Sequence, residues 1–576
     1  MMRVLTTLIV AALAASPSYA ADLVHDAEYY VLERQNKDKW AADDKAVDEK
    51  LAEIRKANGG EPPNILYILI DDIGFGEIGE PYLNYVRGYK TPNINKFADE
   101  GLRFMRMYTE PSCTPTRVAF MTGRQPWRLG MAHTSVAMDG FGMAADEVTL
   151  AEVLKAEGYN TSHVGKWHIG DIEQSFPHNQ GFDYAAFPVH QQGQLGLFSR
   201  QAHETGQTIG ANYSQFRDTY TLDRSFRPIP GHMVTGLEAK AGGKAREVDL
   251  EPGEEWTQQK YIEMNERYQR QAMEQLDSLA AKDEPFFLQY WPLLPLTFTR
   301  SEVKQFTSPN GGFQTESMQQ LDGWVGDILK KLEETGKAEN TVVIIMGDNG
   351  NFTKYAPYSG YSPMVYRGGK ADATEGGVRV DAFIRWPAAI NADGYVGDMI
   401  HVADLYTSLA RIAGGTKHIP NDRVIDGVDQ TSMMLLGETK GRRDHVFIYQ
   451  SNKMAALVKE QYKLYIPGPG ENFVVANFYD LFRDPREEYP VSTPVGAWAG
   501  SPYERIIQRH MAWKKKYPDR PAAVDTPYTG IKNLRPEIIA MRDEWLALKK
   551  QVGLIIVRIE VSGWLKPPQA LKPTYQ

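Results

Sequence analysis

Long apolar runs recur along the chain and alternate with segments of helical periodicity. Residues 64–70 (NILYILI) are apolar almost throughout, and residues 285–290 and 341–346 form similar runs. A strand that is buried on both faces of a parallel sheet has this composition, whereas a half-exposed strand alternates apolar with polar residues. A helical pattern over 318–335 lies between the last two runs. The runs therefore predict buried strands of a parallel sheet.

Start and stop signals for helices fall between further short strands. A threonine-proline pair begins a predicted helix over 91–101, which ends at a glycine, and a strand follows over 102–104. The same cycle repeats with a helix over 149–158 and a strand over 161–164. Strands that alternate with helices in this way form a parallel sheet with helices on both faces. We therefore predict an α/β fold, with a large doubly wound, mostly parallel sheet flanked by helices.

Two segments interrupt this alternation. Residues 21–60 are rich in Lys, Asp, Glu and Ala and lack a long apolar stripe, which predicts a charged, solvated helical arm. Residues 190–255 are rich in Gly, Gln, Ser and Thr and lack apolar periodicity. Irregular segments of this length are usually functional loops rather than core. We expect the 190–255 insert to shape a ligand pocket within a main domain that spans 61–438.

The rest of the chain, 439–576, has a different pattern. Short apolar runs there predict antiparallel strands over 446–449, 454–458, 462–465 and 477–481. A helix is predicted to follow over 536–550. We therefore expect a second, smaller antiparallel α+β domain at the C-terminal end.

Residues 1–20 have the layout of a secretory signal peptide. Arg3 precedes an apolar stretch from Val4 to Ala15, and Ser18-Tyr19-Ala20 has the small-x-small form of a cleavage site. The apolar stretch is too short to span a bilayer. We therefore expect a secreted or periplasmic protein that has no membrane partner. A formal net charge of −9 also argues against nucleic acid as a partner, although it allows an anionic small substrate.

Polar clusters follow two of the predicted buried strands. Asp71-Asp72 follows the strand over 64–70, and Asp348-Asn349 follows the strand over 341–346. The carboxyl ends of parallel strands face one crevice, so these side chains should meet. Adjacent carboxylates repel each other unless a cation neutralises them, and an all-oxygen ligand set suits Ca²⁺ or Mg²⁺ rather than zinc. Taken alone, each pair could equally be an ordinary turn.

Cys113 is the only cysteine of the 576-residue chain. An isolated cysteine is usually buried filler, but this one opens the run Cys113-Thr-Pro-Thr-Arg117, which Thr122-Gly-Arg124 follows. This spacing resembles the signature of type I sulfatases, the formylglycine-dependent, arylsulfatase-like enzymes of the alkaline phosphatase superfamily. The resemblance runs from Pro63 to Gly437 and more weakly to Pro485. It also includes Gly165-Lys166-Trp167-His168, Gly181-Phe-Asp183, Gly347 to Gly350, Gly369-Lys370, Glu375 to Arg379 and Tyr479 to Pro485.

The resemblance implies an alkaline phosphatase-like fold and the hydrolysis of a sulfate monoester, with 61–438 as the catalytic domain. A maturation partner, the formylglycine-generating enzyme, would oxidise Cys113 to Cα-formylglycine. The hydrate of that aldehyde would present a nucleophilic hydroxyl to the sulfur of the ester. The cation, Ca²⁺ with Mg²⁺ as the alternative, would be bound by Asp71, Asp72, Asp348 and Asn349.

The resemblance also implies roles for basic residues around position 113. Arg117 and Lys166 would steady the hydrate and balance charge. His168 would take a proton from the second hydroxyl, and Lys370 would contact the sulfate from the opposite side. A cation and lysines aimed at the sulfate oxygens would stabilise the charge that spreads there in the transition state. We expect Arg367, Glu375 and Arg379 to shape the loop that carries Lys370.

One position departs from the family pattern. After a Pro-Phe-Phe-Leu strand the family usually has Pro-His, whose histidine assists the leaving group. Counted from Pro285, Leu296 stands in its place and cannot donate a proton. Three outcomes stay open: another residue supplies the proton, the natural leaving group needs little help, or the enzyme is slow. Candidate donors are tyrosines of the insert and His178, His190, His203 and His232.

Two further functions stay open beside a sulfuric ester hydrolase. A phosphomonoester or phosphonate ester hydrolase of the same superfamily would need more metal ligands, including histidines near Asp348, and Asn349 speaks against it. A non-enzymatic protein that binds sulfated ligands would fit Leu296. The presence of Cys113 together with both lysines and His168 favours the hydrolase.

Overall fold

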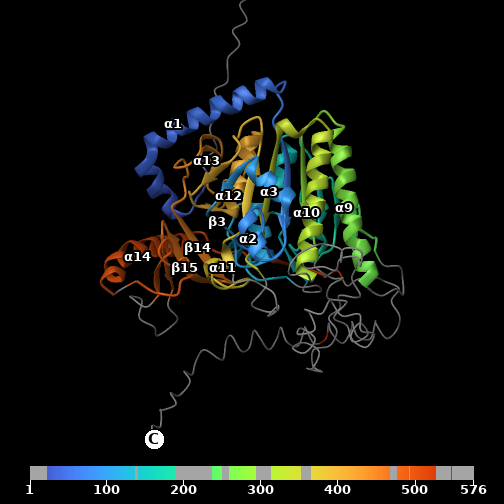
Figure 1. The fold of residues 1–576 in the computed structure, drawn as a ribbon. Helices are drawn as coiled ribbons and strands as arrows, with labels where there is room; N and C mark the ends of the chain where they lie inside the picture. The colour runs from blue at the N-terminus through green and yellow to red at the C-terminus, as the bar shows by residue number, and fades with distance from the viewer. Residues whose placement is uncertain are drawn as a thin grey trace, which may run out of the picture.

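The structure is a computed structural model of the chain. It describes residues 23–135, 140–189, 236–249, 258–293, 313–351, 365–466, 477–491 and 493–526, and the single residues 528 and 547. A large sheet runs through the centre of the molecule between two layers of helices, and a smaller sheet with one long helix lies beside them (Figure 1).

The large sheet contains ten of the described strands, in the order β12-β2-β11-β10-β1-β9-β5-β6-β7-β8. Its central strands pair in parallel, as the apolar runs predict. They are β10 (Thr341–Gly347), β1 (Asn64–Ile70), β9 (Phe286–Trp291), β5 (Asn160–Gly165) and β6 (Tyr184–Phe187). Beyond β10 the sheet continues through antiparallel pairs to β11 (Ala382–Arg385) and β2 (Leu102–Phe104), and β2 pairs in parallel with β12 (Gly394–Val396).

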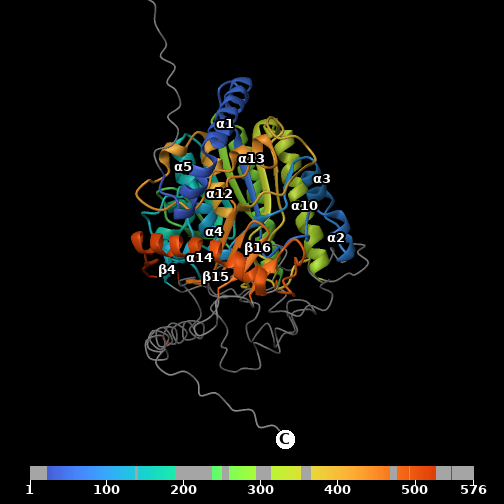
Figure 2. The same ribbon diagram turned by 90° about the vertical axis from the view of Figure 1, so that its left-hand side faces the viewer.

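The strand β1 shows why helices cover both faces. Alternate residues from Ile65 to Leu69 pack into one core cluster, and alternate residues from Leu66 to Ile70 pack into another. The first cluster includes side chains of α4 (Cys113–Thr122), α5 (Leu150–Ala156) and α12 (Val402–Ala413). The second includes side chains of α3 (Pro92–Asp99), α9 (Gln258–Ala280) and α10 (Phe313–Glu334). Because successive side chains of a strand point to opposite faces, a strand that is apolar throughout needs both layers (Figure 2). The predicted doubly wound fold is confirmed.

The N-terminal segment forms the helix α1 (Ala27–Ala57). One side of this helix is buried through Leu32, Trp40, Val47, Leu51 and Ile54, and the last three belong to the same core cluster as α4 and α12. The helix is therefore less solvated than expected from its charge. Its buried face also includes Glu28 and Asp43, so charged residues interrupt the apolar stripe.

The described part of the 190–255 insert is more regular than expected. It contains β7 (Leu237–Lys240) and β8 (Arg246–Glu247), which continue the large sheet beyond β6 in antiparallel pairs. Residues 190–235 and 250–255 lie outside the described residues.

The smaller sheet contains β14 (His445–Gln450), β15 (Lys453–Lys459), β16 (Tyr462–Tyr465) and β17 (Phe478–Asp480). These strands pair antiparallel in sequence order, close to their predicted positions. The long helix α14 (Thr493–Lys516) packs against this sheet through Tyr503 and Ile506. This helix was not predicted, and the predicted helix over 536–550 lies almost wholly outside the described residues.

Short elements connect these layers. They are α2 (Pro81–Val86), β3 (Met107–Tyr108), η1 (Pro126–Leu129), β4 (Phe141–Gly142), η2 (Glu173–Ser175), η3 (Pro177–Asn179), η6 (Ala338–Asn340), α11 (Glu375–Val378), β13 (Ile400–His401), η8 (Thr416–His418), α13 (Thr431–Leu436) and β18 (Ala523–Val524). Among the described residues, no helix has the length and apolarity needed to cross a membrane. The predicted signal peptide, 1–20, lies outside them.

Candidate active site

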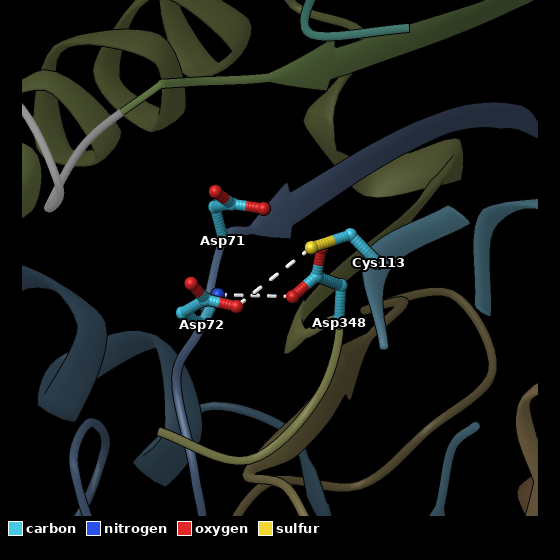
Figure 3. A group of neighbouring side chains, drawn as sticks. All are labelled: Asp71, Asp72, Cys113 and Asp348. Atoms are coloured by element: carbon cyan, nitrogen blue, oxygen red, sulfur yellow. Dashed lines mark hydrogen bonds between the residues drawn. The ribbon is translucent and has the colours of Figure 1, made fainter. Parts of the chain in front are cut away.

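Pairing of β1 with β10 brings the two predicted acidic clusters together. Ile70 pairs with Gly347 at the ends of these strands, so the next residues are adjacent. The backbone N–H of Asp72 donates to Oδ1 of Asp348 over 2.9 Å. Ligand atoms of Asp71, Asp72, Asp348 and Cys113 all lie within 4.8 Å of one another, and all four residues are buried (Figure 3).

Cys113 is the first residue of α4, and the start of this helix places its side chain beside the carboxylates. Its Sγ lies 3.7 Å from Oδ1 of Asp72 and 2.8 Å from Nζ of Lys370. The N-terminus of a helix carries partial positive charge, which favours an anion at this position. Burial, with the Asp348 carboxylate adding to it, raises the pKa of the Cys113 thiol far above its usual range. Burial therefore favours the neutral form of the unmodified thiol.

Basic side chains from three parts of the chain neutralise the carboxylates. Nζ of Lys166 lies 2.7 Å from Oδ1 of Asp71, and Nζ of Lys370 lies 2.7 Å from Oδ1 of Asp72. Nη2 of Arg117 lies 2.8 Å from Oδ2 of Asp348 and 3.2 Å from Asp71. Arg117 comes one helical turn after Cys113, so α4 presents both residues to the cluster.

The pKa values of these groups show how strongly they interact. Burial raises the pKa of Asp71, but Lys166, Lys370 and Arg117 outweigh it and hold that pKa well below its usual range. Burial, together with repulsion from Asp71, raises the pKa of Asp348. Burial lowers the pKa of Lys370, but Asp72 and the other anionic groups reverse this effect. The site therefore holds a dense set of opposite charges away from water.

The side-chain amide of Asn349 indicates that the site could bind a metal ion. Its Nδ2 donates to Oδ1 of Asp72 over 2.6 Å and to the Gly350 carbonyl over 2.8 Å. Its Oδ1 is buried and accepts no hydrogen bond from the described residues. A buried acceptor without a partner is costly, and a hard cation would satisfy it. With the oxygens of Asp71, Asp72 and Asp348, the donor set fits Ca²⁺ or Mg²⁺.

Lys166 and His168 follow the end of β5. The His168 ring nitrogen Nε2 lies 2.7 Å from the Ser135 carbonyl, and the Ser135 N–H donates to Oγ1 of Thr114 beside the cysteine. His168 has a φ of 62° and Asp72 a φ of 54°. Side-chain-bearing residues keep this left-handed conformation only where the surroundings hold it, and such residues cluster at functional sites.

Among the histidines considered as leaving-group acids, His178 is the one that the structure describes. Leu296, His190, His203 and His232 all lie outside the described residues. His178 lies in η3, where its Nε2 is 3.5 Å from Oε1 of Glu173. Burial lowers its pKa. A role of His178 as proton donor stays a prediction.

Sequence reasoning missed part of the surroundings of Lys370. Glu375 and Arg379 are buried and paired, with 2.9 Å between Nη1 and Oε2, as expected for residues that shape the loop. Their further partners Tyr108, Lys463 and Glu487 were not predicted. Lys463 is 88 residues from Glu375 along the chain, so no local spacing could indicate the contact.

The fold, together with a buried group of acidic side chains and Cys113 beyond the carboxyl ends of its central strands, is that of a hydrolase of the alkaline phosphatase superfamily. The chain belongs to the sulfatase family, whose sequence profile matches residues 63–415. It is a sulfuric ester hydrolase.

Named relatives agree with this assignment. The chain is 29% identical over 508 residues to N-acetylgalactosamine-6-sulfatase of Mus musculus, which covers 81% of this chain and 89% of that protein. It is 33% identical over 400 residues to arylsulfatase A of Homo sapiens, covering 68% of this chain and 71% of that protein. Among solved structures it is similar to the PsFucS1 sulfatase from Pseudoalteromonas sp., with a TM-score of 0.72, 26% identity and coverage of 84% and 96%.

Proposed function

We propose that this sulfatase acts through Cα-formylglycine at position 113, with Ca²⁺ bound by Asp71, Asp72, Asp348 and Asn349. The position of Cys113 carries the proposal, because its Sγ lies 2.8 Å from Nζ of Lys370 and within the group of buried carboxylates. A thiolate is the nucleophilic form of cysteine, and burial keeps this thiol neutral. Unmodified cysteine is therefore poorly suited to the reaction at this position.

The chain's own residues would then orient the ester and handle charge and protons. The bound cation would supply a Lewis acid and lower the pKa of a nearby hydroxyl. Lys370 and Lys166 are proposed to bind sulfate oxygens as negative charge spreads over them. Arg117, whose guanidinium lies 4.8 Å from the ring centroid of Trp291, would hold Asp71 and Asp348 in place. His168, anchored on Ser135, would accept the proton of the second hydroxyl.

We further propose that the substrate is a sulfated sugar and that the protein is exported. Relatives named N-acetylgalactosamine-6-sulfatase support the sugar. The signal-like segment 1–20, with a cleavage site expected after Ala20, supports a periplasmic or secreted location. With Leu296 at the usual histidine position, we expect slower turnover of esters that have poor leaving groups.

Maturation and substrate class can be tested together. Peptide mass spectrometry of enzyme co-expressed with a formylglycine-generating enzyme should show formylglycine at position 113. That enzyme should hydrolyse nitrophenyl sulfate in preference to nitrophenyl phosphate. The Cys113→Ala variant should bind the cation and lose turnover. Active protein that contains only unmodified cysteine would exclude the mechanism.

Leaving-group dependence is measured in the same assay with a 6-sulfated sugar. Lack of a general acid lowers rates by about 10²–10⁴ on poor leaving groups and little on good ones. A sugar sulfate cleaved as fast as nitrophenyl sulfate would indicate that another residue donates the proton.

A further inference from the structure

A buried ionic network joins the smaller sheet to the loop that carries Lys370. Lys463 lies on β16, and its Nζ is 2.8 Å from Oε1 of Glu487 and 3.1 Å from Oε1 of Glu375. All three side chains are fully buried. Glu375 begins α11, which follows the Lys370 loop directly. The network therefore connects the C-terminal domain with a segment of the active site.

A gain in folding stability does not by itself explain why these charged residues are buried together. Removing charges from water costs much of what their attraction returns, and apolar side chains of similar volume often stabilise a protein as well or better. Buried polar groups with satisfied partners do fix one geometry. Here Tyr465 donates to Glu487 over 2.6 Å, and Tyr108 and Arg379 each donate to Oε2 of Glu375 over 2.9 Å.

Backbone contacts carry this fixed geometry to Lys370. The N–H of Glu375 donates to Oε2 of Glu487 over 2.8 Å. The N–H of Lys370 donates to the Asn351 carbonyl over 2.8 Å, so the loop is also held by the segment that follows β10. Nε2 of Gln450, on β14 of the smaller sheet, donates to the carbonyl of Ala371 over 2.7 Å. The smaller sheet thus contacts the loop on the residue after Lys370 and again at Glu375.

The same network contacts the segment that leads to Cys113. Tyr108 is the last residue of β3, and the N–H of Thr109 donates to the carbonyl of Val378 in α11 over 2.8 Å. The N–H of Ala371 donates to the carbonyl of Pro111, two residues before the cysteine. Lys370 and position 113 are therefore both held relative to α11.

We propose that Lys463 of the C-terminal domain is a positioning residue for Lys370 and sets its ammonium group against position 113. This inference rests on the proposed contact between Lys370 and the sulfate. A displacement of a catalytic group by about 1 Å can lower a rate about 10²-fold. The smaller domain is then part of the machinery that binds sulfate.

A matched pair of variants tests this role. Lys463→Met removes the network's ammonium group, and Lys459→Met makes the same change on β15, where Lys459 pairs with Asp444 rather than with Glu375 or Glu487. We expect Lys463→Met to lower kcat on nitrophenyl sulfate about 10- to 100-fold and to weaken inhibition by inorganic sulfate. Lys463→Arg should restore part of both. Lys459→Met should change neither.

A double variant separates positioning from general damage. In a Lys370→Ala background, adding Lys463→Met should lower kcat no further, because its effect passes through the missing lysine. Multiplied losses, or a folded Lys463→Met enzyme with normal kcat and sulfate inhibition, would overturn the inference. Normal kcat in Lys370→Ala itself would instead refute the proposed function of Lys370.

A second variant covers the case in which Lys463→Met does not fold. Gln450 is exposed and, within the described part of the chain, donates one hydrogen bond to the loop, so Gln450→Ala should fold normally. We expect it to lower kcat several-fold and to weaken sulfate inhibition at an unchanged Tm. An unchanged kcat in this variant would count against the role of the smaller sheet.

Discussion

At the scale of single residues, each buried carboxylate of the site has a cationic partner. Asp71 pairs with Lys166, and Asp72 pairs with Lys370. Arg117 pairs with Asp348. If the proposed divalent cation bound the same oxygens, the two lysines would be free to contact the sulfate, and we therefore expect cation binding and substrate binding to be coupled. Without the cation, the ion pairs keep the carboxylates neutralised.

Removal of the cation should therefore abolish hydrolysis without unfolding the protein. A cation that binds only the folded state stabilises it by about 2.7 kcal/mol at 100 times its Kd, and chelation should lower Tm by no more than this allows. We would measure turnover of nitrophenyl sulfate and Tm by calorimetry in EDTA, with calcium-saturated EDTA as the control. Calcium should restore turnover. Unfolding at 25 °C on chelation would contradict this account of the ion pairs.

At the scale of elements, a helix or strand could be predicted where its own local sequence determines it. The strands β1, β9 and β10 could be predicted because burial on both faces makes them apolar at nearly every position. The helix α14 could not, because its first half carries Gly and Pro, with Pro502 inside the helix, and packing against the smaller sheet outweighs its low propensity.

Some residues of the candidate site can likewise be predicted from local sequence, and others cannot. Asp71, Asp348 and the run from Cys113 to Arg117 lie in short motifs at strand ends and a helix start, so the sequence indicates them directly. Lys463 and Glu487 act on the site through partners 88 and 112 residues away. Only the folded chain brings those partners together.

The buried side of α1 leads to a prediction about stability. Val47 is fully buried against the main core, so Val47→Ala removes apolar contacts and leaves a cavity. We expect a loss of about 2 kcal/mol and a lower Tm, with kcat and KM unchanged because Val47 packs in the core and is not one of the residues that form the candidate site. Thermal unfolding would measure the loss. Glu49→Ala, at an exposed position of the same helix, should leave Tm unchanged.

At the scale of the whole molecule, the N-terminal segment connects both domains. Val24 forms a bridge with Val424 of the main domain. Oδ2 of Asp26 lies 2.9 Å from Nη2 of Arg128 in η1 and 2.9 Å from Nδ1 of His510 in α14. One carboxylate thus joins the main domain to the helix of the smaller domain. Because that domain also holds the Lys370 loop, this contact helps to keep the site assembled.

The pH dependence of this contact can be predicted from the pKa of Asp26. Burial raises that pKa, but His510 and Arg128, with His445 farther away, outweigh burial and lower it from 3.8 to about 2. A carboxyl with a lowered folded-state pKa stabilises the protein above its unfolded value and loses this effect as pH falls through the folded value. The stabilisation at neutral pH is about 2 kcal/mol. Asp26→Asn should therefore have a lower Tm than the wild type at pH 6.

The difference in Tm between Asp26→Asn and the wild type should shrink as the pH is lowered from 5 towards 2. Comparing the two proteins at each pH cancels the titration of groups that they share. Asp422→Asn is the control: the neighbouring Arg423 lowers the pKa of Asp422 too, but this carboxylate is exposed, so solvent screens its pairing and the pair contributes little to stability. Its Tm should follow the wild type throughout. A deficit of Asp26→Asn that stayed constant down to pH 2 would show that packing rather than charge at Asp26 holds the two domains together.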